Sequence, residues 1–391
     1  MPHALAQAVE VVTTALAVAG MGYFLAALLA ARAFLVRRRS SLPLFAPGVT
    51  LLKSLKGLDP GMMDAFRSHC RQDYPGDFEM LFGVSSMEDP AAAAVAELQA
   101  EFPQRAIRLI VCPQRLGANG KVSTLIQLLP AARYDFLLIN DSDITVSPRY
   151  LERVMALHAP AAAAGRKIGL VTALYRGRAH GTLPSRLEAL GIATDFMPSI
   201  LLARWLEGGL RYGLGSTLAV SREALESIGG LAVLVDQLAD DYELGERIYK
   251  AGYGIALTHE VVETSVPAYT WGEFFDHQLR WYRTIRDARP WGYAGLIFTY
   301  GMGLALMNVL ASGLSPLSLW LLALSFFLRL GVAMTVGAEV LGDRQVLPGV
   351  WLLPLRDLMA LGLWAAGFAG NTIVWRGERF AVKAGRLEKA R

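Results

Sequence analysis

The chain has 391 residues, 53% of them hydrophobic, and a mean hydropathy of +0.35. This is too apolar for a wholly soluble protein, and the length allows one folded domain together with membrane spans. The net charge of +4 does not indicate nucleic acid binding, because the basic residues gather beside apolar stretches, where they would meet anionic lipid head groups. No spacing typical of RNA-binding modules or zinc fingers occurs, which excludes these nucleic-acid-binding classes.

The first predicted element is a membrane helix. Residues 11–36 are almost free of charge, with only Arg32 near their end, and are long enough to cross about 30 Å of hydrocarbon. Three arginines follow at residues 37–39, whereas a cleaved signal peptide carries its basic residues before the apolar run. We therefore predict a retained anchor over residues 1–40, with the next segment in the cytoplasm by the positive-inside rule.

Residues 41–290 are predicted to form a cytoplasmic domain. Short apolar runs alternate there with helical stretches, which is typical of an α/β domain with a mainly parallel sheet. Both cysteines, Cys70 and Cys112, lie in this segment, which fits a reducing compartment, although two small buried side chains need no such explanation. The expected strands are residues 49–52, 78–84, 107–111, 136–139 and 168–174, with helices such as 91–102 and 121–129 between them.

Acidic residues follow the expected strands at their carboxyl ends, where ligands of such sheets bind. Glu88 and Asp89 come just after the second strand, and Asp141 and Asp143 just after the fourth. Two carboxylates one residue apart suit Mg²⁺ or Mn²⁺ holding a diphosphate, because these ions take few protein carboxylates and fill their shell with water and phosphate oxygens. The alternative is structural, since aspartates at strand ends often make turns or cap helices.

Two further features of this domain carry charge. Lys121 opens a helix after a glycine-rich loop and either contacts phosphate or is simply solvated. Asp240 and Glu243 have the spacing of a capping box for a helix over residues 242–251, so we predict a structural role for Asp240. Asp241 would then face a cleft and take a proton from an attacking hydroxyl, unless it is a solvated first-turn residue. The helix N-terminus lowers its pKa and burial raises it, which leaves the balance open.

Three apolar stretches follow the domain, at residues 291–312, 315–337 and 350–375, and each is long enough to span a membrane. A basic tail comes after them at residues 376–391. If domain and tail are both cytoplasmic, the number of full crossings between them must be even. Either one stretch is therefore re-entrant or interfacial, or the tail lies outside.

Two parts of the chain are candidates for contact with a lipid. Arg356 and Asp357 lie inside the third stretch, where they either pair within the protein, next to a polar pocket, or snorkel to the interface. Residues 183–206 mix apolar residues with few charges between the two acidic clusters, and we predict that they are interfacial and face the acceptor. Ordinary helix packing against the sheet is the alternative for this segment.

Taken together, these residues resemble the ceramide glucosyltransferase-like family of inverting glycosyltransferases, and more closely its bacterial hopanoid branch (HpnI type). The resemblance runs in matching order over about residues 49–281, and the flanking membrane segments agree with it. It implies a GT-A type nucleotide-sugar-binding sheet with flanking helices, plus N- and C-terminal transmembrane helices. The motifs that carry it are LLKSLKG (51–57), EDP (88–90), GANGK (117–121), DSD (141–143), GLGS (213–216), DDY (240–242) and HQLRW (277–281).

The family pattern implies roles for the acidic residues. A first aspartate near the uracil or ribose corresponds to Asp89, with Glu88 left as the alternative contact. The metal-diphosphate aspartate corresponds to Asp141, assisted by Asp143 as a second metal ligand. The general base corresponds to Asp241.

The last motif carries the remaining implied roles. Its first position is His277, where ceramide enzymes have glutamine or arginine, so a role that needs an amide or guanidinium there is in doubt. Arg280 suits a permanent cation against the diphosphate leaving group. Trp281 would close the acceptor pocket or anchor at the interface, as in an aromatic belt. Donor contacts are further implied at Lys53, Lys121, His277 and Gln278.

The resemblance implies transfer of a sugar from a UDP-sugar, UDP-N-acetylglucosamine in the hopanoid branch, to a polyol-bearing hopanoid such as bacteriohopanetetrol. It implies a divalent metal and a multi-pass protein of the bacterial inner membrane, with the domain facing the cytoplasm. Ceramide glucosylation is the alternative acceptor chemistry, and processive polysaccharide synthesis is disfavoured because about four spans are few for a polymer channel. A catalytically inactive lipid-binding protein is the alternative outside enzymes, and the intact acidic residues argue against it.

Overall fold

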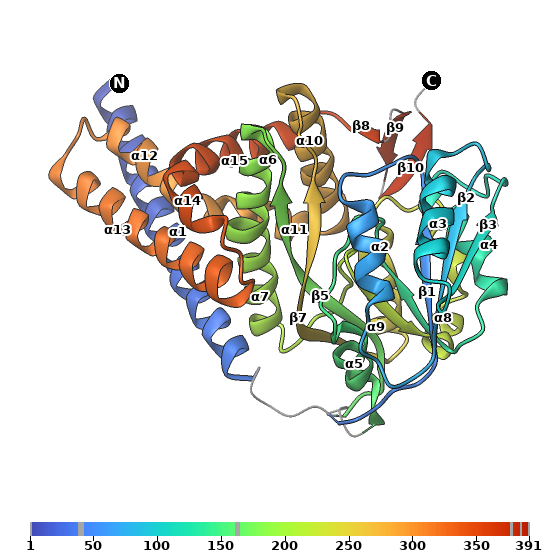
Figure 1. Cartoon of the computed structure of the whole chain (residues 1–391). Helices are drawn as coiled ribbons and strands as arrows, with labels where there is room; N and C mark the ends of the chain where they lie inside the picture. Colours follow the sequence, from blue (N-terminus) through green and yellow to red (C-terminus); the bar gives the residue numbers. More distant parts are fainter. Residues whose placement is uncertain (1, 38–42, 161–164, 376–377, 384, 390–391) are drawn as a thin grey trace. The chain divides into compact units, whose positions relative to one another are not determined.

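A computed structural model describes residues 2–37, 43–160, 165–375, 378–383, 385–389 of the chain (Figure 1). Arg38 and Arg39 of the predicted basic triplet, and Arg376 and Arg391 of the predicted tail, lie outside the described residues. The chain divides into two compact units. The helical unit comprises Met1–Arg39, Ala179–Glu207 and Ala268–Arg379, and the sheet unit comprises Ser40–Arg178, Gly208–Pro267 and Phe380–Arg391.

The sheet unit is built on a mixed sheet whose described strands run in the order β3-β2-β1-β4-β6-β5-β7. The first four pair in parallel, as expected from strands separated by helices, whereas β6 pairs antiparallel with both β4 and β5. The strands are β1 (Val49–Ser54), β2 (Phe78–Val84), β3 (Ala106–Val111), β4 (Phe136–Ile139), β5 (Ile168–Ala179), β6 (Leu218–Ser221) and β7 (Gly254–Val266).

The helices of the sheet unit begin at identifiable caps. Asp89 accepts a hydrogen bond from the Ala91 amide at the start of α3, and Asn119 accepts one from the Val122 amide at the start of α4. Both caps directly follow loops at the carboxyl edge of the parallel strands. The helices of this unit are α2 (Met62–Cys70), α3 (Pro90–Glu101), α4 (Gly120–Leu128), η1 (Leu129–Ala131), α5 (Tyr150–Met155), η2 (Ala156–His158), α8 (Arg222–Ser227), η5 (Leu231–Leu234) and α9 (Asp240–Lys250).

The predicted basic tail contains two antiparallel strands, β9 (Glu378–Lys383) and β10 (Arg386–Lys389). Residues from Phe380 onward belong to the sheet unit. Phe380, Val382 and Leu387 are buried, and charged side chains such as Lys383 are exposed between them. This alternation of buried and exposed residues is that of a strand with one covered face.

The helical unit begins with α1 (Pro2–Arg37) and ends with the short strand β8 (Thr372–Trp375). The third apolar stretch predicted for the C-terminal region is therefore shorter than expected, because its helix ends at Gly367 and residues 372–375 are extended. The other elements are α6 (Leu183–Gly191), η4 (Ile192–Phe196), α7 (Met197–Leu206), α10 (Trp271–Ala288), α11 (Pro290–Gly295), η6 (Leu296–Tyr300), α12 (Gly301–Ala311), α13 (Pro316–Val332), η7 (Ala333–Val340), α14 (Val346–Gly349), η8 (Val350–Leu352) and α15 (Leu353–Gly367).

Five helical segments among the described residues are long and apolar enough to cross a membrane. Four of them match the stretches predicted from hydropathy, and the fifth is the segment that we expected to be interfacial. The segments are Gln7–Val36, Leu183–Leu206, Pro290–Ala311, Pro316–Val340 and Val346–Gly367, all within the helical unit.

Small and polar side chains hold these helices together, as is usual for helices packed in a membrane. A Cβ on Gly20 of α1 would lie 2.5 Å from the Cα of Gly301 of α12, so the two backbones touch and a larger residue would separate them. Elsewhere along the same two helices, the Asn308 amide of α12 donates to the hydroxyls of Thr13 at 3.1 Å and Thr14 at 2.7 Å, both in α1. In Figure 1, α1 accordingly runs beside α12 and α13.

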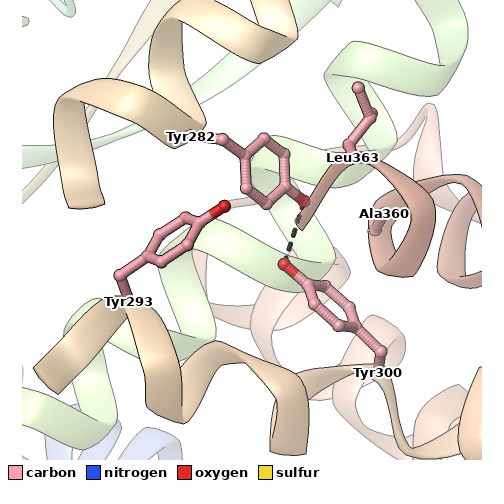
Figure 2. Close-up of a cluster of buried hydrophobic side chains, with 5 residues drawn as sticks. All are labelled: Tyr282, Tyr293, Tyr300, Ala360 and Leu363. Atoms are coloured by element: carbon pink, nitrogen blue, oxygen red, sulfur yellow. Dashed lines mark hydrogen bonds between the residues drawn. The ribbon is translucent and has the colours of Figure 1, made fainter. Parts of the chain in front are cut away.

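An aromatic cluster joins α10, α11, η6 and α15 (Figure 2). The hydroxyl of Tyr300 donates to that of Tyr282 at 2.9 Å, and the hydroxyl of Tyr293 donates to the Trp364 carbonyl at 2.6 Å. Each buried phenol thus has a hydrogen-bond partner, which removes the main cost of burying tyrosine. A Cβ on Gly367 would lie 2.1 Å from the Tyr293 hydroxyl, so the end of α15 needs glycine at this position.

Candidate active site

The loop after β4 carries the first acidic cluster and is anchored by Asn140. This side chain is buried, and its amide donates to the Ser216 carbonyl at 2.7 Å and to the Tyr150 hydroxyl at 3.1 Å. Its oxygen lies 3.3 Å from Nε2 of His69, whose pKa is held well below its usual value by burial and by nearby Lys53. A neutral His69 donates through one ring nitrogen, so this network fixes the loop without adding charge.

Asp143 points toward the end of β7. Its Oδ2 accepts from the Thr264 hydroxyl at 2.5 Å and from the Ser265 amide at 2.9 Å. Burial and the neighbouring charge of Asp141 raise the pKa of Asp143 to about 6, although the Thr264 bond lowers it. The two carboxylates of the D-S-D motif therefore repel each other.

Two lysines contact Asp141. Lys121 Nζ is 2.6 Å from Asp141 Oδ1 and 3.7 Å from Asp240 Oδ2, and these carboxylates raise its pKa although burial opposes them. Lys53 is buried and donates to the Asp141 carbonyl at 3.1 Å. Burial lowers the pKa of Lys53 to about 7, against the opposing charges of Asp141 and Asp143. One lysine thus pairs with the side chain and the other with the backbone of the same aspartate.

The second acidic cluster does not form the predicted capping box. Helix α9 begins at Asp240, its N-cap is Ala239, and no side chain caps it. Asp240 Oδ1 instead accepts from the Asn119 amide at 3.2 Å. Its role is structural, as expected, but it ties α9 to the loop before α4, because tertiary donors compete successfully for its oxygens.

Asp241 faces the same space as Asp141. A Cβ on Gly215 would lie 3.1 Å from Asp241 Oδ2 and 3.7 Å from Asp141 Oδ2, so both carboxylates border this glycine. The close approach depends on two other glycines, because a Cβ on Gly245 of α9 would lie 2.2 Å from the Gly213 amide. The two acidic clusters, about a hundred residues apart in the chain, therefore share one site.

The environment of Asp241 raises the pKa of its carboxyl group. Burial and the adjacent Asp240 raise the pKa of Asp241 to about 6, whereas Lys121 and a hydrogen bond from the Tyr242 amide at 2.8 Å lower it. The sequence could not show whether the helix N-terminus or burial has the larger effect on this pKa. In the structure, burial has the larger effect. A carboxylate with a pKa near 6 is well matched to accepting a proton at neutral pH.

The segment before this cluster is held by the C-terminal strands of the sheet unit. The Leu387 amide donates to the Asp236 carbonyl at 2.8 Å, and the Leu238 amide donates to the Gly385 carbonyl at 2.9 Å. Asp236 in turn accepts from the Ala118 amide at 2.8 Å, within the GANGK motif. From the sequence, the C-terminal residues were predicted only as a basic tail. The alternation of apolar and charged residues among them was the signal that could have predicted this contact.

We expect Leu387→Ala to destabilise the sheet unit by about 2–4 kcal/mol, the usual cost of truncating a buried leucine. Leu387 is 4% exposed, whereas Glu388 beside it is exposed. Glu388→Ala is therefore the matched control, with an expected change of about 0.5 kcal/mol or less. Thermal unfolding of the purified protein measures both. Equal effects of the two substitutions would mean that β10 does not stabilise the sheet unit.

The two candidates for contact with the nucleotide differ in their surroundings. Asp89 caps α3 and also accepts from the Gly57 amide at 3.0 Å, which ties the loop after β1 to the loop after β2. Glu88 is exposed, and its backbone amide donates to the Ser86 hydroxyl oxygen at 3.1 Å. Asp89 thus has a structural task at this edge of the sheet, while the Glu88 side chain is open to solvent.

The HQLRW motif lies in the helical unit, on α10. This helix starts with a true capping box, in which Thr270 and Glu273 satisfy each other's backbone amides. His277 Nδ1 lies 3.0 Å from Glu188 Oε2, and the Gln278 amide donates to the same oxygen at 3.2 Å. Sequence reasoning missed Glu188, because nothing in its local sequence distinguishes it from a surface glutamate.

The other two residues of this motif contact aromatic rings of the helical unit. The Arg280 guanidinium carbon lies 5.9 Å from the centre of the Trp375 ring, a distance that permits a cation–π interaction. The rings of Trp281 and Phe196 are 5.7 Å apart. The motif therefore joins α10 to β8 and to η4, both within the helical unit.

The donor set of the D-S-D motif fits a divalent cation. Among the described residues, no three histidine, cysteine or acidic side chains lie together as a closed metal site. Mg²⁺ and Mn²⁺ do not require one, because water and phosphate oxygens complete their shell. The Asp141 side chain is 45% exposed, and its charge raises the pKa of Asp143. An added cation would relieve this repulsion.

Residues 12–388 match the model of glycosyl transferase family 21. The chain belongs to this family. It is therefore a glycosyltransferase, as the motifs predicted, and the apolar helices of this family 21 protein indicate that it is a membrane protein.

Curated relatives of this family 21 chain include ceramide glucosyltransferases. Ceramide glucosyltransferase 1 of Caenorhabditis elegans is 23% identical over 354 residues, which cover 87% of this chain and 72% of the relative. Ceramide glucosyltransferase 3 of the same organism is 23% identical over 377 residues, which cover 90% of this chain and 75% of the relative. The ceramide glucosyltransferase-like resemblance is confirmed at the level of the family.

A solved structure supports the predicted fold of the family 21 chain. The mannosyltransferase PcManGT of Pyrobaculum calidifontis, solved in complex with GDP-Man and Mn²⁺, has a TM-score of 0.53 and 18% sequence identity. The similarity covers 92% of this chain and 99% of that one. The GT-A type fold is thereby confirmed.

Proposed function

We propose that this protein transfers a sugar from a UDP-sugar to a membrane lipid alcohol with inversion at the anomeric carbon. The observation that carries the proposal is the meeting of Asp141 and Asp241 at Gly215, which supports a diphosphate-side carboxylate and a proton acceptor in one site. The family resemblance favours UDP-N-acetylglucosamine as donor and a hopanoid polyol as acceptor. The curated relatives favour ceramide glucosylation as the second candidate.

Asp241 acts as the general base in this proposal. Its carboxylate accepts the proton of the lipid hydroxyl while the hydroxyl oxygen forms a bond to the anomeric carbon. The bond from this carbon to the UDP oxygen breaks on the opposite side, and UDP leaves with the electron pair. A single displacement of this kind inverts the configuration. The raised pKa of Asp241 supports the assignment, because it strengthens the base.

The remaining residues, apart from Trp281, act on the donor. Asp141 and Asp143 would hold a divalent cation, which supplies positive charge to the diphosphate when bound. Lys121 pairs with Asp141, and its ammonium group is proposed to contact a phosphate oxygen of the donor as well. Arg280 is proposed as a further cation for the leaving group, with Trp281 beside the acceptor. Further donor contacts are proposed for Lys53, Glu88, Asp89, His277 and Gln278.

The proposed location is the bacterial inner membrane, with the sheet unit in the cytoplasm. Cytoplasmic UDP-sugars reach a site on this side directly. A lipid acceptor can keep its hydrocarbon in the bilayer while its hydroxyl end reacts, which avoids the cost of about 25 cal/mol for each Å² of apolar surface moved into water. The five apolar segments of the helical unit support this arrangement.

We expect kcat to fall as the pH drops below about 6. Because Asp241 must be ionised to accept a proton and its pKa is raised to about 6, its active fraction falls about tenfold per pH unit below that value. Asp143 has a similarly raised pKa, so the donor KM should rise in the same range, and kcat at saturating donor separates the two effects. A kcat that stays constant down to pH 4.5 would remove Asp241 from the role of base.

A competition assay tests the acceptor. Purified protein is given one UDP-sugar with equal amounts of bacteriohopanetetrol and ceramide, and the glycolipids are quantified by mass spectrometry. The proposal predicts preferential glycosylation of the hopanoid polyol. A clear preference for ceramide would replace the hopanoid assignment with the second candidate and leave the glycosyltransferase mechanism standing. Absence of any glycolipid with every UDP-sugar would contradict both candidates and favour a catalytically inactive lipid-binding protein.

A further inference from the structure

A cavity lies within the helical unit, lined by α6, η4, α7, α10, η6 and α15. Its wall combines carboxylates, an amide and a guanidinium with aromatic and aliphatic side chains. Tyr282 and Tyr300, whose hydroxyls meet in Figure 2, form part of this wall. The charged and amide groups that line it are Glu188, Asp195, Gln278 and Arg356.

Arg356 is the unusual member of this wall. It is 5% exposed, and among the described residues its Nε and Nη1 have no hydrogen-bond partner. The Nε lies 3.1 Å from Asp195 Oδ2, but the two groups are not aligned for a hydrogen bond. Buried guanidinium N–H groups are seldom left without an acceptor. Nε has the carboxylate of Asp195 beside it, so Nη1 is the donor that indicates an oxygen supplied by a ligand.

The position of Arg356 depends on Gly191. A Cβ on this glycine would lie 2.4 Å from both Nε and Nη2 of Arg356. Gly191, the last residue of α6, therefore leaves room for the Arg356 guanidinium, which lies against the cavity. A flexible surface arginine would not need such a space.

The charges around the cavity oppose an anionic ligand. Arg329 is buried and contacts both Asp195 and Asp357, and Arg356 pairs with Asp195. Two guanidinium groups thus face two carboxylates, and Glu188 adds a further carboxylate on the cavity wall. A phosphate group would meet these carboxylates without a surplus of positive charge, whereas hydroxyl groups can both donate and accept here.

We propose that this cavity binds the neutral, hydroxyl-bearing headgroup of the lipid acceptor. Arg356 donates to a headgroup oxygen, and Glu188 accepts from a headgroup hydroxyl. The rings of Phe196 and Trp281, both in the wall, present apolar faces to the carbon skeleton between the hydroxyls. This inference rests on the proposed function, since it assigns the acceptor specificity of that transfer to the helical unit.

Binding of matched single-chain lipids tests the headgroup. We would titrate the protein in phosphatidylcholine nanodiscs with 1-O-dodecylglycerol, a neutral diol, and with dodecyl phosphate, and follow the thermal unfolding temperature. The diol is expected to stabilise the protein at concentrations about tenfold or more below those of the phosphate. Equal or tighter binding of dodecyl phosphate would overturn the assignment of a neutral headgroup.

Two substitutions test the place of binding. Ser199→Trp fills the cavity without changing its charge, and Arg356→Lys keeps the charge but removes the forked donors. Each should raise the acceptor KM and the diol concentration needed for stabilisation by about 10-fold to 100-fold, the loss expected for one hydrogen bond to a charged group. The UDP-sugar KM should change by about twofold or less, because neither Ser199 nor Arg356 is among the proposed donor contacts.

The matched control is Ser312→Trp. Ser312 follows α12 outside the cavity, and its hydroxyl donates to the carbonyl three residues before it, as that of Ser199 does. An unchanged acceptor KM and unchanged diol binding in both cavity variants would overturn this inference and leave the proposed transfer intact. If the wild type transfers no sugar but binds the diol, and both cavity variants lose this binding while Ser312→Trp keeps it, the proposed function fails and the cavity assignment stands.

Discussion

Replacing Asp241 by asparagine is expected to lower kcat by about 10²-fold to 10⁴-fold, the usual contribution of a positioned base. Asparagine has nearly the same shape but cannot accept the proton of the lipid hydroxyl. Binding of UDP should stay near the wild-type value, because Asp141 and Lys121 remain in place on the donor side. Steady-state kinetics with lipid acceptor and a separate UDP-binding titration measure the two quantities.

Glu246→Gln is the matched control for this experiment. Glu246 lies on the same helix, α9, and pairs with Lys250 at 2.8 Å near the surface. Its neutralisation should leave kcat within about twofold of the wild type, because surface ion pairs contribute little. Near-normal turnover of the Asp241 variant would exclude this residue as the base.

The second large effect is expected at Asp141. Asp141→Asn should lower kcat by about 10²-fold to 10³-fold, comparable to removing one group that stabilises developing charge. Excess chelator should abolish transfer by the wild type, and Mn²⁺ or Mg²⁺ should restore it. In the variant, stabilisation by Mn²⁺ together with UDP in thermal unfolding should also be reduced, which reports on binding independently of turnover.

Asp135→Asn provides the comparison for Asp141. Asp135 directly precedes β4, and its side chain is 87% exposed, so the same chemical change occurs at the opposite end of this strand, away from the site. It should not alter the metal requirement. Full transfer by the wild type in excess chelator would contradict the metal assignment, whatever the variants do.

The parallel part of the sheet could be predicted because β1, β2 and β4 are buried on both faces along most of their length. The bounds of β2 and β4 match the predicted ranges, since continuous apolar runs have sharp ends where polar residues begin. The strands β6 and β7 were not predicted. The first has only four residues, and the second is half-buried with histidine, glutamate and threonine among its apolar residues, so only β5 was predicted in the antiparallel part of the sheet.

The candidate site was predictable where a residue's role follows from its place at a strand end. Asp141 and Asp143 could be found in this way, and Asp241 by its position after Asp240. The capping box was wrong, because Asn119, distant in sequence, supplies the hydrogen bond to Asp240. Contacts between residues far apart in the chain depend on the tertiary fold, and no local pattern in this chain encodes them.

The cavity of the helical unit illustrates the same limit. The sequence identified Arg356 as a costly charge in an apolar stretch, but its partner Asp195 lies more than a hundred residues earlier. Residues 183–206 were predicted to be interfacial, and the continuous helical segment that they form is also long and apolar enough to cross a membrane. Hydropathy describes each helix alone, whereas the buried ion pairs depend on which helices meet.

Inverting transfer of a sugar to a lipid hydroxyl determines the anomeric configuration of the product, which can be measured. Purified protein would be incubated with UDP-N-acetylglucosamine, whose sugar is α-linked, and with bacteriohopanetetrol, and the glycolipid analysed by proton NMR. We expect a β-linked product that the Asp241→Asn variant forms at least about 10²-fold more slowly than the wild type. An α-linked product, or equal formation of the β-linked product by both proteins, would contradict this expectation.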